Sequence, residues 1–130
     1  MTQEHKELLI KDICARLPYG VKFMCNKNIY TTKGLDLIVA DEGDLEYAVT
    51  AKCTAPIEID FIKPYLFPLS SMTEEQKMFL KQQNWCIAIS TSGTVETTIE
   101  GIDWFNKNHF DYRCLIESGL AINATGLNIY

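Results

Sequence analysis

The spacing of apolar residues predicts a helix at the start of the chain. Over residues 3–17 they recur every three or four positions, the period of an amphipathic α-helix. Thr2 is suited to cap the first turn, and Pro18 ends the helix before a turn at Gly20. The apolar positions are Leu8, Leu9, Ile10, Ile13, Cys14 and Leu17.

Apolar and polar residues then alternate with a period of two, which is typical of half-buried β-strands. This alternation predicts strands at residues 21–26, 28–32, 35–40, 46–52 and 57–61. The acidic sequence DEGD at 41–44 predicts a turn between the third and fourth of them. Consecutive strands joined by such short turns favour an antiparallel meander.

The second half of the chain alternates between extended and helical patterns. Pro64 and Pro68 exclude a helix interior and a central strand. We therefore expect an extended segment that covers a sheet edge with Tyr65, Leu66, Phe67 and Leu69. The sequence TEEQ at 73–76 matches a capping box and predicts a helix to about Gln83. A strand at 85–90, a turn at 91–93 and a helix at 95–108 follow.

These elements predict a single α+β domain over residues 1–130. Strands are grouped together while helices stand towards the ends of the order. We expect a small twisted antiparallel sheet, either a meander or a half-open barrel. The N-terminal helix and the C-terminal helices would pack on this sheet.

The charge distribution disfavours broad nucleic-acid binding. Residues 1–33 hold six basic and three acidic side chains, whereas residues 34–130 hold six basic and fourteen acidic ones, giving −5 in total. Phosphate binding relies on clustered cations. The basic residues of the first third are dispersed, which favours a solvated face over a weak nucleic-acid site; they are Lys6, Lys11, Arg16, Lys22, Lys27 and Lys33.

The cysteines and the apolar runs limit cofactors and location. Five cysteines stand at least eleven residues apart, with neither a CxxC pair nor a Cys/His knuckle, so we expect no metal site and no cofactor. Small buried thiols in a reducing cytoplasm are the plain interpretation. The apolar runs are too short for a membrane span, and the N-terminus lacks a signal-peptide pattern.

The sequence NHFDYRCLIESGLAI, at 108–122, has the densest group of chemically capable side chains. One interpretation is structural: His109 ends a helix, Asp111 caps a second helix through the amides of Arg113 or Cys114, and Gly119 stops it at positive φ. Tyr112 would then face the core, together with Leu115 and Ile116.

The alternative interpretation is a small ligand-binding or hydrolytic site. His109 and Asp111 would act as base and orienting group, and Arg113 would hold an anion. The sequence shows no nucleophile elbow and no glycine-rich phosphate loop. We therefore predict no catalytic residue, and we keep catalysis as the less favoured alternative.

Two aromatic residues are candidates for an interface. Trp104 stands one position off the apolar stripe of its predicted helix, and Phe67 lies in the proline-framed segment. This stripe comprises Val95, Ile99, Ile102 and Phe105. Together Trp104 and Phe67 would form an exposed apolar patch that binds a protein. The alternative is that both lie at the boundary of the core.

Two stretches resemble a family of short proteins of uncharacterised function from gut bacteria and their phages and prophages. They are KPYLFPLSSMT at 63–73 and HFDYRCLIESGLA at 109–121, and ICARLPYGVK at 13–22 is similar too. The family commonly has a basic residue where this chain has Phe67 and a glycine where it has Cys114. The resemblance implies a phage or prophage context, with an accessory or counter-defence role, and it implies no activity or ligand.

The sequence therefore favours a cytoplasmic, non-enzymatic protein-interaction module. Its partner would be another protein or a second copy of the chain, and nucleic acid and membrane are not expected partners. The candidate interaction or ligand residues are Phe67, Trp104, His109, Asp111, Tyr112 and Arg113.

Overall fold

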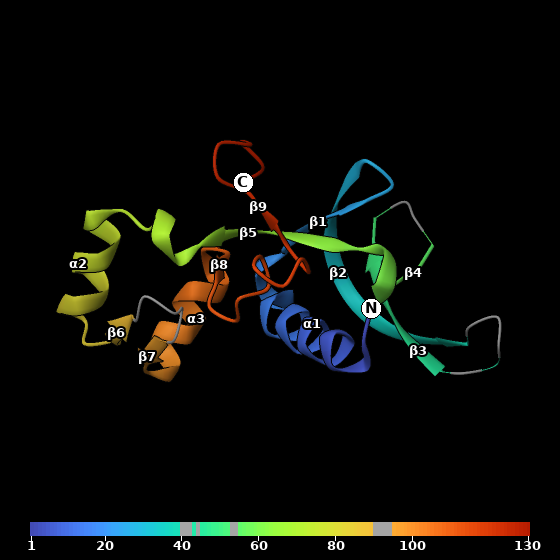
Figure 1. Cartoon of the computed structure of the whole chain (residues 1–130), viewed down its shortest axis with the longest axis horizontal. Helices are drawn as coiled ribbons and strands as arrows, with labels where there is room; N and C mark the ends of the chain where they lie inside the picture. Colours follow the sequence, from blue (N-terminus) through green and yellow to red (C-terminus); the bar gives the residue numbers. More distant parts are fainter. Residues whose placement is uncertain (40–42, 44, 53–54, 90–94) are drawn as a thin grey trace. The chain divides into compact units, whose positions relative to one another are not determined.

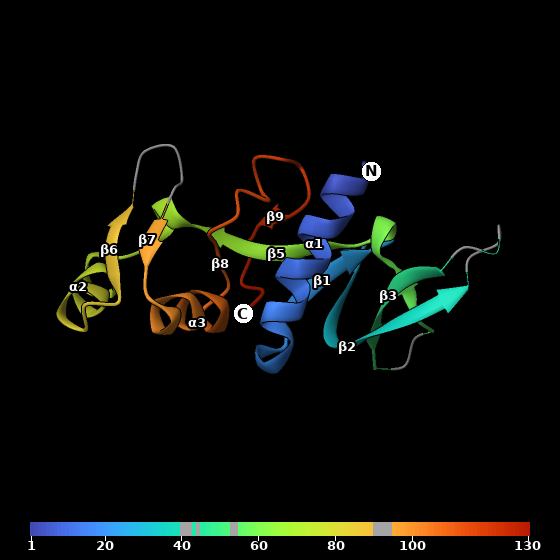
Figure 2. The same ribbon diagram turned by 90° about the horizontal axis from the view of Figure 1, so that it is seen from below.

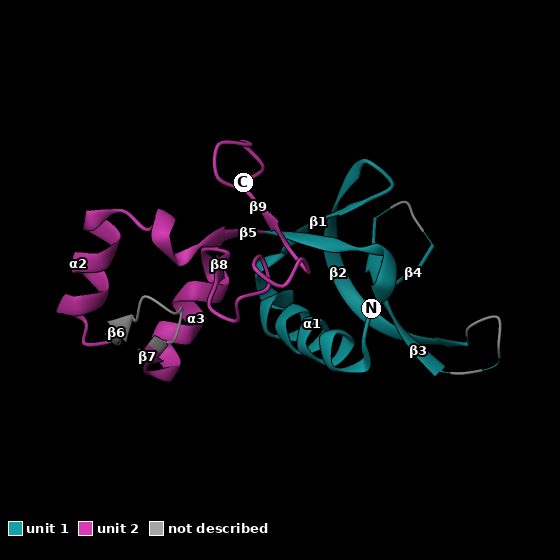
Figure 3. Ribbon diagram, in the orientation of Figure 1, with its two compact units in different colours: residues 1–65 teal, residues 66–130 magenta. Residues whose placement is uncertain are grey.

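The computed structural model shows an α+β protein with two compact units (Figure 3). It describes residues 1–39, 43, 45–52, 55–89 and 95–130. Unit 1 comprises residues 1–65 and unit 2 comprises residues 66–130. Within the described ranges there are three α-helices, and the main sheet is mixed and does not close. The predicted turns at 41–44 and 91–93 fall almost wholly outside the described residues.

The first helix, α1, spans Gln3–Arg16, as its apolar period predicts (Figure 1). The hydroxyl of Thr2 accepts the His5 amide at 3.1 Å, which confirms the predicted cap. A 3-10 turn, Leu17–Tyr19, follows and ends at Gly20 with φ of +69°. The buried side of α1 was predicted only in part, because it comprises Leu9, Asp12, Ile13 and Arg16.

Two hairpins form most of unit 1. Strand β1, Lys22–Cys25, pairs with β2, Asn28–Val39, through a two-residue turn. Both turn residues, Asn26 and Lys27, have positive φ, as a type I′ turn requires. The two strands predicted at 28–32 and 35–40 are one strand, whose register shifts between Thr32 and Gly34.

Strand β2 then pairs with β3, Leu45–Ala51, which confirms the predicted hairpin. The strand predicted at 57–61 is wrong beyond its first two residues. Strand β4 is only Ile57–Glu58, and Ile59–Phe61 form a 3-10 turn. Residues 59 and 62 are both buried, and the turn places both side chains inward with a spacing of three.

The proline-framed segment is a strand, contrary to our expectation of an edge cover. Strand β5, Lys63–Pro68, pairs antiparallel with β1 through Lys63 and Pro64. Its other end, in unit 2, pairs parallel with β8 through Phe67 and Pro68, so the sheet is mixed rather than wholly antiparallel. Proline lacks a backbone N–H and so cannot donate a hydrogen bond to a neighbouring strand. Pro64 and Pro68 each stand at the end of a short ladder.

Unit 2 begins with the end of β5 and a 3-10 turn, Leu69–Ser71. Helix α2, Glu74–Gln82, has the predicted capping box between Thr73 and Gln76. Strand β6, Cys86–Ile89, confirms the predicted apolar strand, but it pairs with β7, Val95–Thr97. Val95 therefore belongs to a strand and not to the helix predicted at 95–108.

The last helix, α3, is Ile99–Lys107 and is capped by Thr98. Its predicted apolar stripe is wrong at Ile99, whose side chain is exposed, and right at Phe105, which is buried. Gly101 is buried as well. Strand β8, Phe110–Asp111, follows directly, and β9, Ile122–Asn123, pairs with β5.

The second helix predicted after Asp111 is a single turn. The amide of Ser118 donates to the Cys114 carbonyl, and Leu120 and Gly119 donate to Leu115 and Ile116. These last two bonds are those of a Schellman motif, with Gly119 in its left-handed position at φ of +75°. The predicted glycine stop is thus confirmed, although it closes one turn.

Each unit has its own apolar interior. In unit 1, α1 lies against the strands (Figure 2), and the large apolar side chains that are fully buried are Leu9, Ile13, Val21, Phe23, Val49, Ile59 and Ile62. In unit 2 the interior is centred on Met72, Leu80, Phe105 and Phe110.

Among the residues that the structure describes, no helix combines the length and apolar character that a membrane crossing requires.

Candidate functional site

His109 directly follows Asn108, the C-cap residue of α3. Its backbone has φ of +63°, the left-handed conformation in which glycine is usual. Its amide donates to the Asn106 carbonyl at 3.2 Å, and its carbonyl accepts the Phe67 amide at 2.8 Å. Its ring stacks on Tyr130 with centroids 3.6 Å apart. Thus His109 joins α3, β5 and the chain end.

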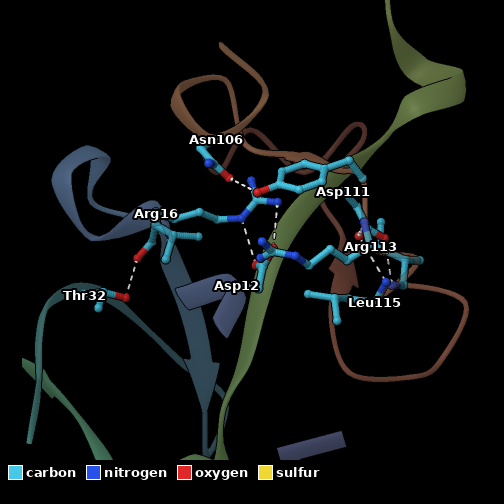
Figure 4. Close-up of polar contacts among 10 residues, drawn as sticks. Asp12, Arg16, Thr32, Asn106, Asp111, Arg113 and Leu115 are labelled. Atoms are coloured by element: carbon cyan, nitrogen blue, oxygen red, sulfur yellow. Dashed lines mark hydrogen bonds and ion pairs between the residues drawn. The ribbon is translucent and has the colours of Figure 1, made fainter. Parts of the chain in front are cut away.

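Asp111 binds the backbone of the turn that follows it (Figure 4). One carboxylate oxygen accepts the amides of Arg113 and Leu115, at 3.2 and 3.0 Å. The other accepts the amide of Ile116 at 2.9 Å. The Arg113 contact was predicted, whereas the other two were not. Asp111 is buried and holds three amides that would otherwise lack acceptors.

Tyr112 and Arg113 are also positioned by structural contacts. The Tyr112 hydroxyl donates to Oδ1 of Asn106 at 2.8 Å, and Asn106 is buried in α3. The guanidinium carbon of Arg113 lies 4.8 Å from the centre of the Tyr112 ring, within the range of a cation–π contact. Sequence reasoning missed Asn106 because a single asparagine on a helix has no distinguishing pattern.

Trp104 and Phe67 contact the same ring. Phe110 stacks on Trp104 at 5.6 Å between centroids and lies 6.1 Å from Phe67. Both residues are half-buried and pack against the interior of unit 2. This is the placement expected for the core boundary and not for an exposed patch.

The cluster at 109–113 therefore offers little free chemistry. The proposed base is His109 and its orienting group is Asp111, but both Asp111 oxygens accept backbone amides of the following turn. Nearby, burial raises the pKa of the Cys114 thiol, and the charges of Glu117 and Asp111 raise it further, which reduces its thiolate fraction. In the described ranges, no group of three or more His, Cys, Asp and Glu side chains could hold a metal ion.

A different surface in unit 1 has the features of an interface. The ladder between β2 and β3 pairs Leu37 with Tyr47 and Val39 with Leu45, so all four side chains lie on one face. Their exposed fractions are 57%, 43%, 69% and 69% respectively. We call these four residues the hairpin face. It continues the apolar row of Val49, which is fully buried.

The charged residues of the same hairpin lie on its opposite face. Asp36 pairs with Ala48 and Ile38 with Glu46, one position out of phase with the hairpin face. Glu46 and Asp60 flank Lys6 of α1, whose nitrogen lies 3.4 and 3.2 Å from their oxygens. The hydrogen bond to Asp60, with the charges of Asp60 and Glu46, raises the pKa of Lys6 despite partial desolvation. Lys6 thus links α1 to this face at Glu46, while Asp36 on the same face is exposed.

The sequence predicted the apolar row of the hairpin but not its exposure. Alternation at 35–40 indicates that one side of the strand is apolar, and apolar sides normally face a core. Which segment covers that side is decided by tertiary packing. In unit 1 that packing covers this side at Val49 and leaves it exposed at Tyr47 and Leu45.

Comparison of the chain with family models, with curated proteins and with solved structures found no match.

Proposed function

We propose that this chain is a non-enzymatic protein-interaction module that binds through the hairpin face. The observation that carries the proposal is the cross-strand array of Leu37, Val39, Leu45 and Tyr47, four neighbouring apolar side chains that remain exposed. Contiguous exposed apolar surface is costly in water and marks interaction sites. The partner is another protein or a second copy of the chain.

The hairpin also needs cover for its own stability. Strand β4 reaches only the pairs Ala48 with Glu58 and Val49 with Ile57, so the part of the hairpin beyond them has two strands. Two-stranded ribbons are marginally stable alone in water, and burying one face against another surface stabilises them. A bound partner would supply this second layer.

The cellular setting is part of the same proposal. We place the module in the cytoplasm, which agrees with free thiols at Cys14, Cys25 and Cys114. The first of these is exposed, so the expectation that every thiol is buried was wrong at Cys14. The phage or prophage association, with its accessory or counter-defence role, rests on the sequence resemblance alone.

Neither alternative function gains a supporting observation. In a hydrolytic site, Asp111 would have to orient His109 with a carboxylate that already accepts three amides of its own turn. A nucleic-acid site in the first third has fewer available cations than the sequence suggested. Arg16 is buried in an ion pair with Asp12, and Lys6 is bound by two carboxylates.

The test compares the full chain with a variant in which Leu37→Glu and Tyr47→Glu are combined. Both proteins are immobilised at equal density, and retained host proteins and retained soluble copies of the chain are quantified. We expect the wild type to retain a partner and the variant to lose it. Equal retention by both, or no retention by either, would refute binding through this face.

Ile99→Glu is the matched control. Ile99 is 78% exposed in unit 2, at the first position of α3, where a carboxylate is favoured by the helix dipole. The Ile99→Glu substitution removes a comparable exposed apolar side chain and adds a carboxylate on a different surface. The control should bind as the wild type does, and circular dichroism verifies that all variants fold.

A further inference from the structure

We infer that the hairpin face is a homodimer interface, in which it packs on the same face of a second copy. This inference rests on the proposed function and names its partner. A two-fold axis requires only that one patch be complementary to itself. The two-by-two array of Leu37, Val39, Leu45 and Tyr47 meets that requirement, because it is an apolar sheet surface.

Charge favours a second copy despite the net charge of −5. Two acidic chains repel each other unless the surfaces that meet are uncharged. The hairpin face has no ionisable side chain other than the Tyr47 phenol, while Asp36 and Glu46 point away from it. Glu46 is further balanced by Lys6. Stacking two hairpin faces therefore does not bring the carboxylates of Asp36 and Glu46 together.

The absence of charge on these four positions also disfavours a selective foreign partner. Specificity for a different protein is normally set by charged and hydrogen-bonding groups that reject wrong partners. Here only the Tyr47 hydroxyl can hydrogen-bond. An apolar surface selects its partner mainly by complementary shape. In a homodimer both partners present the same four side chains.

The area of these four side chains alone corresponds to a weak dimer. The exposed fractions of the four side chains correspond to roughly 400 Å² per chain, or about 800 Å² for two, before flanking residues are added. Specific interfaces begin at about 1,000 Å². Two sheets that pack face to face lie about 10 Å apart, with their strand directions within about 30° of each other. At that distance the side chains of one hairpin face would interdigitate with those of the second copy.

The experiment is sedimentation velocity of the full chain from about 5 to about 200 µM, a range suited to a weak dimer. We expect a concentration-dependent shift towards twice the monomer mass. Leu37→Glu and Tyr47→Glu, singly, should each weaken dimerisation at least about tenfold, because each places two like charges at the axis. Ile99→Glu should leave it unchanged. Tyr47→Thr, which retains β propensity, tests the loss of apolar area should a glutamate variant fail to fold.

A second measurement locates the interface. Benzoyl-phenylalanine at position 45 should cross-link two chains, with the captured peptide within residues 33–51. A wild type that stays monomeric, a dimer insensitive to the hairpin variants, or cross-links only to other segments would each overturn the inference. A monomer that still retains a foreign protein through the hairpin face would overturn the homodimer and leave the proposed function standing.

Discussion

At the scale of single residues, polar side chains in this protein mostly organise backbone. Asp111 is the clearest case, because one buried carboxylate accepts three amides of the turn at 113–116. What resembled a catalytic cluster in the sequence is a set of contacts that fixes a chain reversal. The same short carboxylate suits both purposes, so residue type alone does not distinguish them.

We predict that Asp111→Ala lowers the free energy of unfolding by about 2–4 kcal/mol, since it leaves three amides without an acceptor. Asp111→Asn should lose less, because its carbonyl oxygen still accepts. Urea denaturation measures both. Glu117→Ala, an exposed change in the same turn, should stay within about 0.5 kcal/mol. A stable Asp111→Ala protein would show that the turn does not depend on the carboxylate.

Asp12 and Arg16 form a second polar pair that the sequence did not reveal. Their side chains are fully buried on α1, with Arg16 donating from Nε to Asp12 at 2.8 Å (Figure 4). The prediction that Arg16 lies on a solvated basic face is wrong, because its side chain is fully buried. A spacing of four residues permits an ion pair equally well in water or in a core.

We predict that Asp12→Ala costs about 3–5 kcal/mol, because it leaves a buried guanidinium without its carboxylate. The double change Asp12→Leu with Arg16→Met should recover most of that loss, since it removes both charges. Thermal and urea unfolding report the difference, with the exposed Lys11→Ala as the control on the same helix. Equal losses in the single and double variants would contradict this account.

At the scale of elements, the joint between α3 and the strand pair β6–β7 depends on one glycine. The Trp85 carbonyl accepts the Thr98 amide at 2.8 Å and the Thr97 hydroxyl at 2.5 Å, which brings this backbone close to the first turn of α3. A Cβ on Gly101 would lie 2.6 Å from that carbonyl oxygen. The close approach is possible only without a side chain.

Gly101→Ala should therefore destabilise the protein by about 1–3 kcal/mol through overpacking. Helix propensity alone predicts the opposite sign, because alanine is favoured over glycine by about 1 kcal/mol. Differential scanning calorimetry of Gly101→Ala beside Glu100→Ala separates these two effects. A raised melting temperature for Gly101→Ala would mean that the helix moves away from Trp85 at little cost.

For the whole molecule, the separation of charged and apolar surfaces determines how association depends on salt. The chain has a net charge of −5, while the hairpin face is uncharged. At 0.1 M salt, the repulsion between charges that lie more than about 10 Å apart on two acidic copies is largely screened. The same salt weakens any binding that depends on phosphate contacts.

We therefore predict that dimerisation strengthens about two- to fivefold between 0.05 and 0.5 M NaCl, because repulsion is screened while apolar burial remains. Sedimentation equilibrium at several salt concentrations measures the dissociation constant. A dimer that dissociates as salt rises would instead indicate an interface held by ion pairs, and the hairpin face offers none.

Local sequence signals determined those parts of the fold that rest on interactions within a few residues. Thr2, the Thr73–Gln76 capping box and Gly119 were predicted because each satisfies nearby backbone groups. The β2–β3 hairpin followed from alternation alone. These features need no knowledge of distant chain segments, and they suffice for the α+β class.

Tertiary structure alone decided which surfaces are covered and which residues meet. The prolines of β5 accept strand pairing because each stands at the end of a short ladder, and Val95 joins a strand because β6 pairs with it. The sequence shows that one side of the hairpin is apolar. That side is core at Val49, which is fully buried, and it is exposed at Leu37 and Tyr47 of the same strand pair. Burial is a property of distant segments, so periodicity cannot determine it.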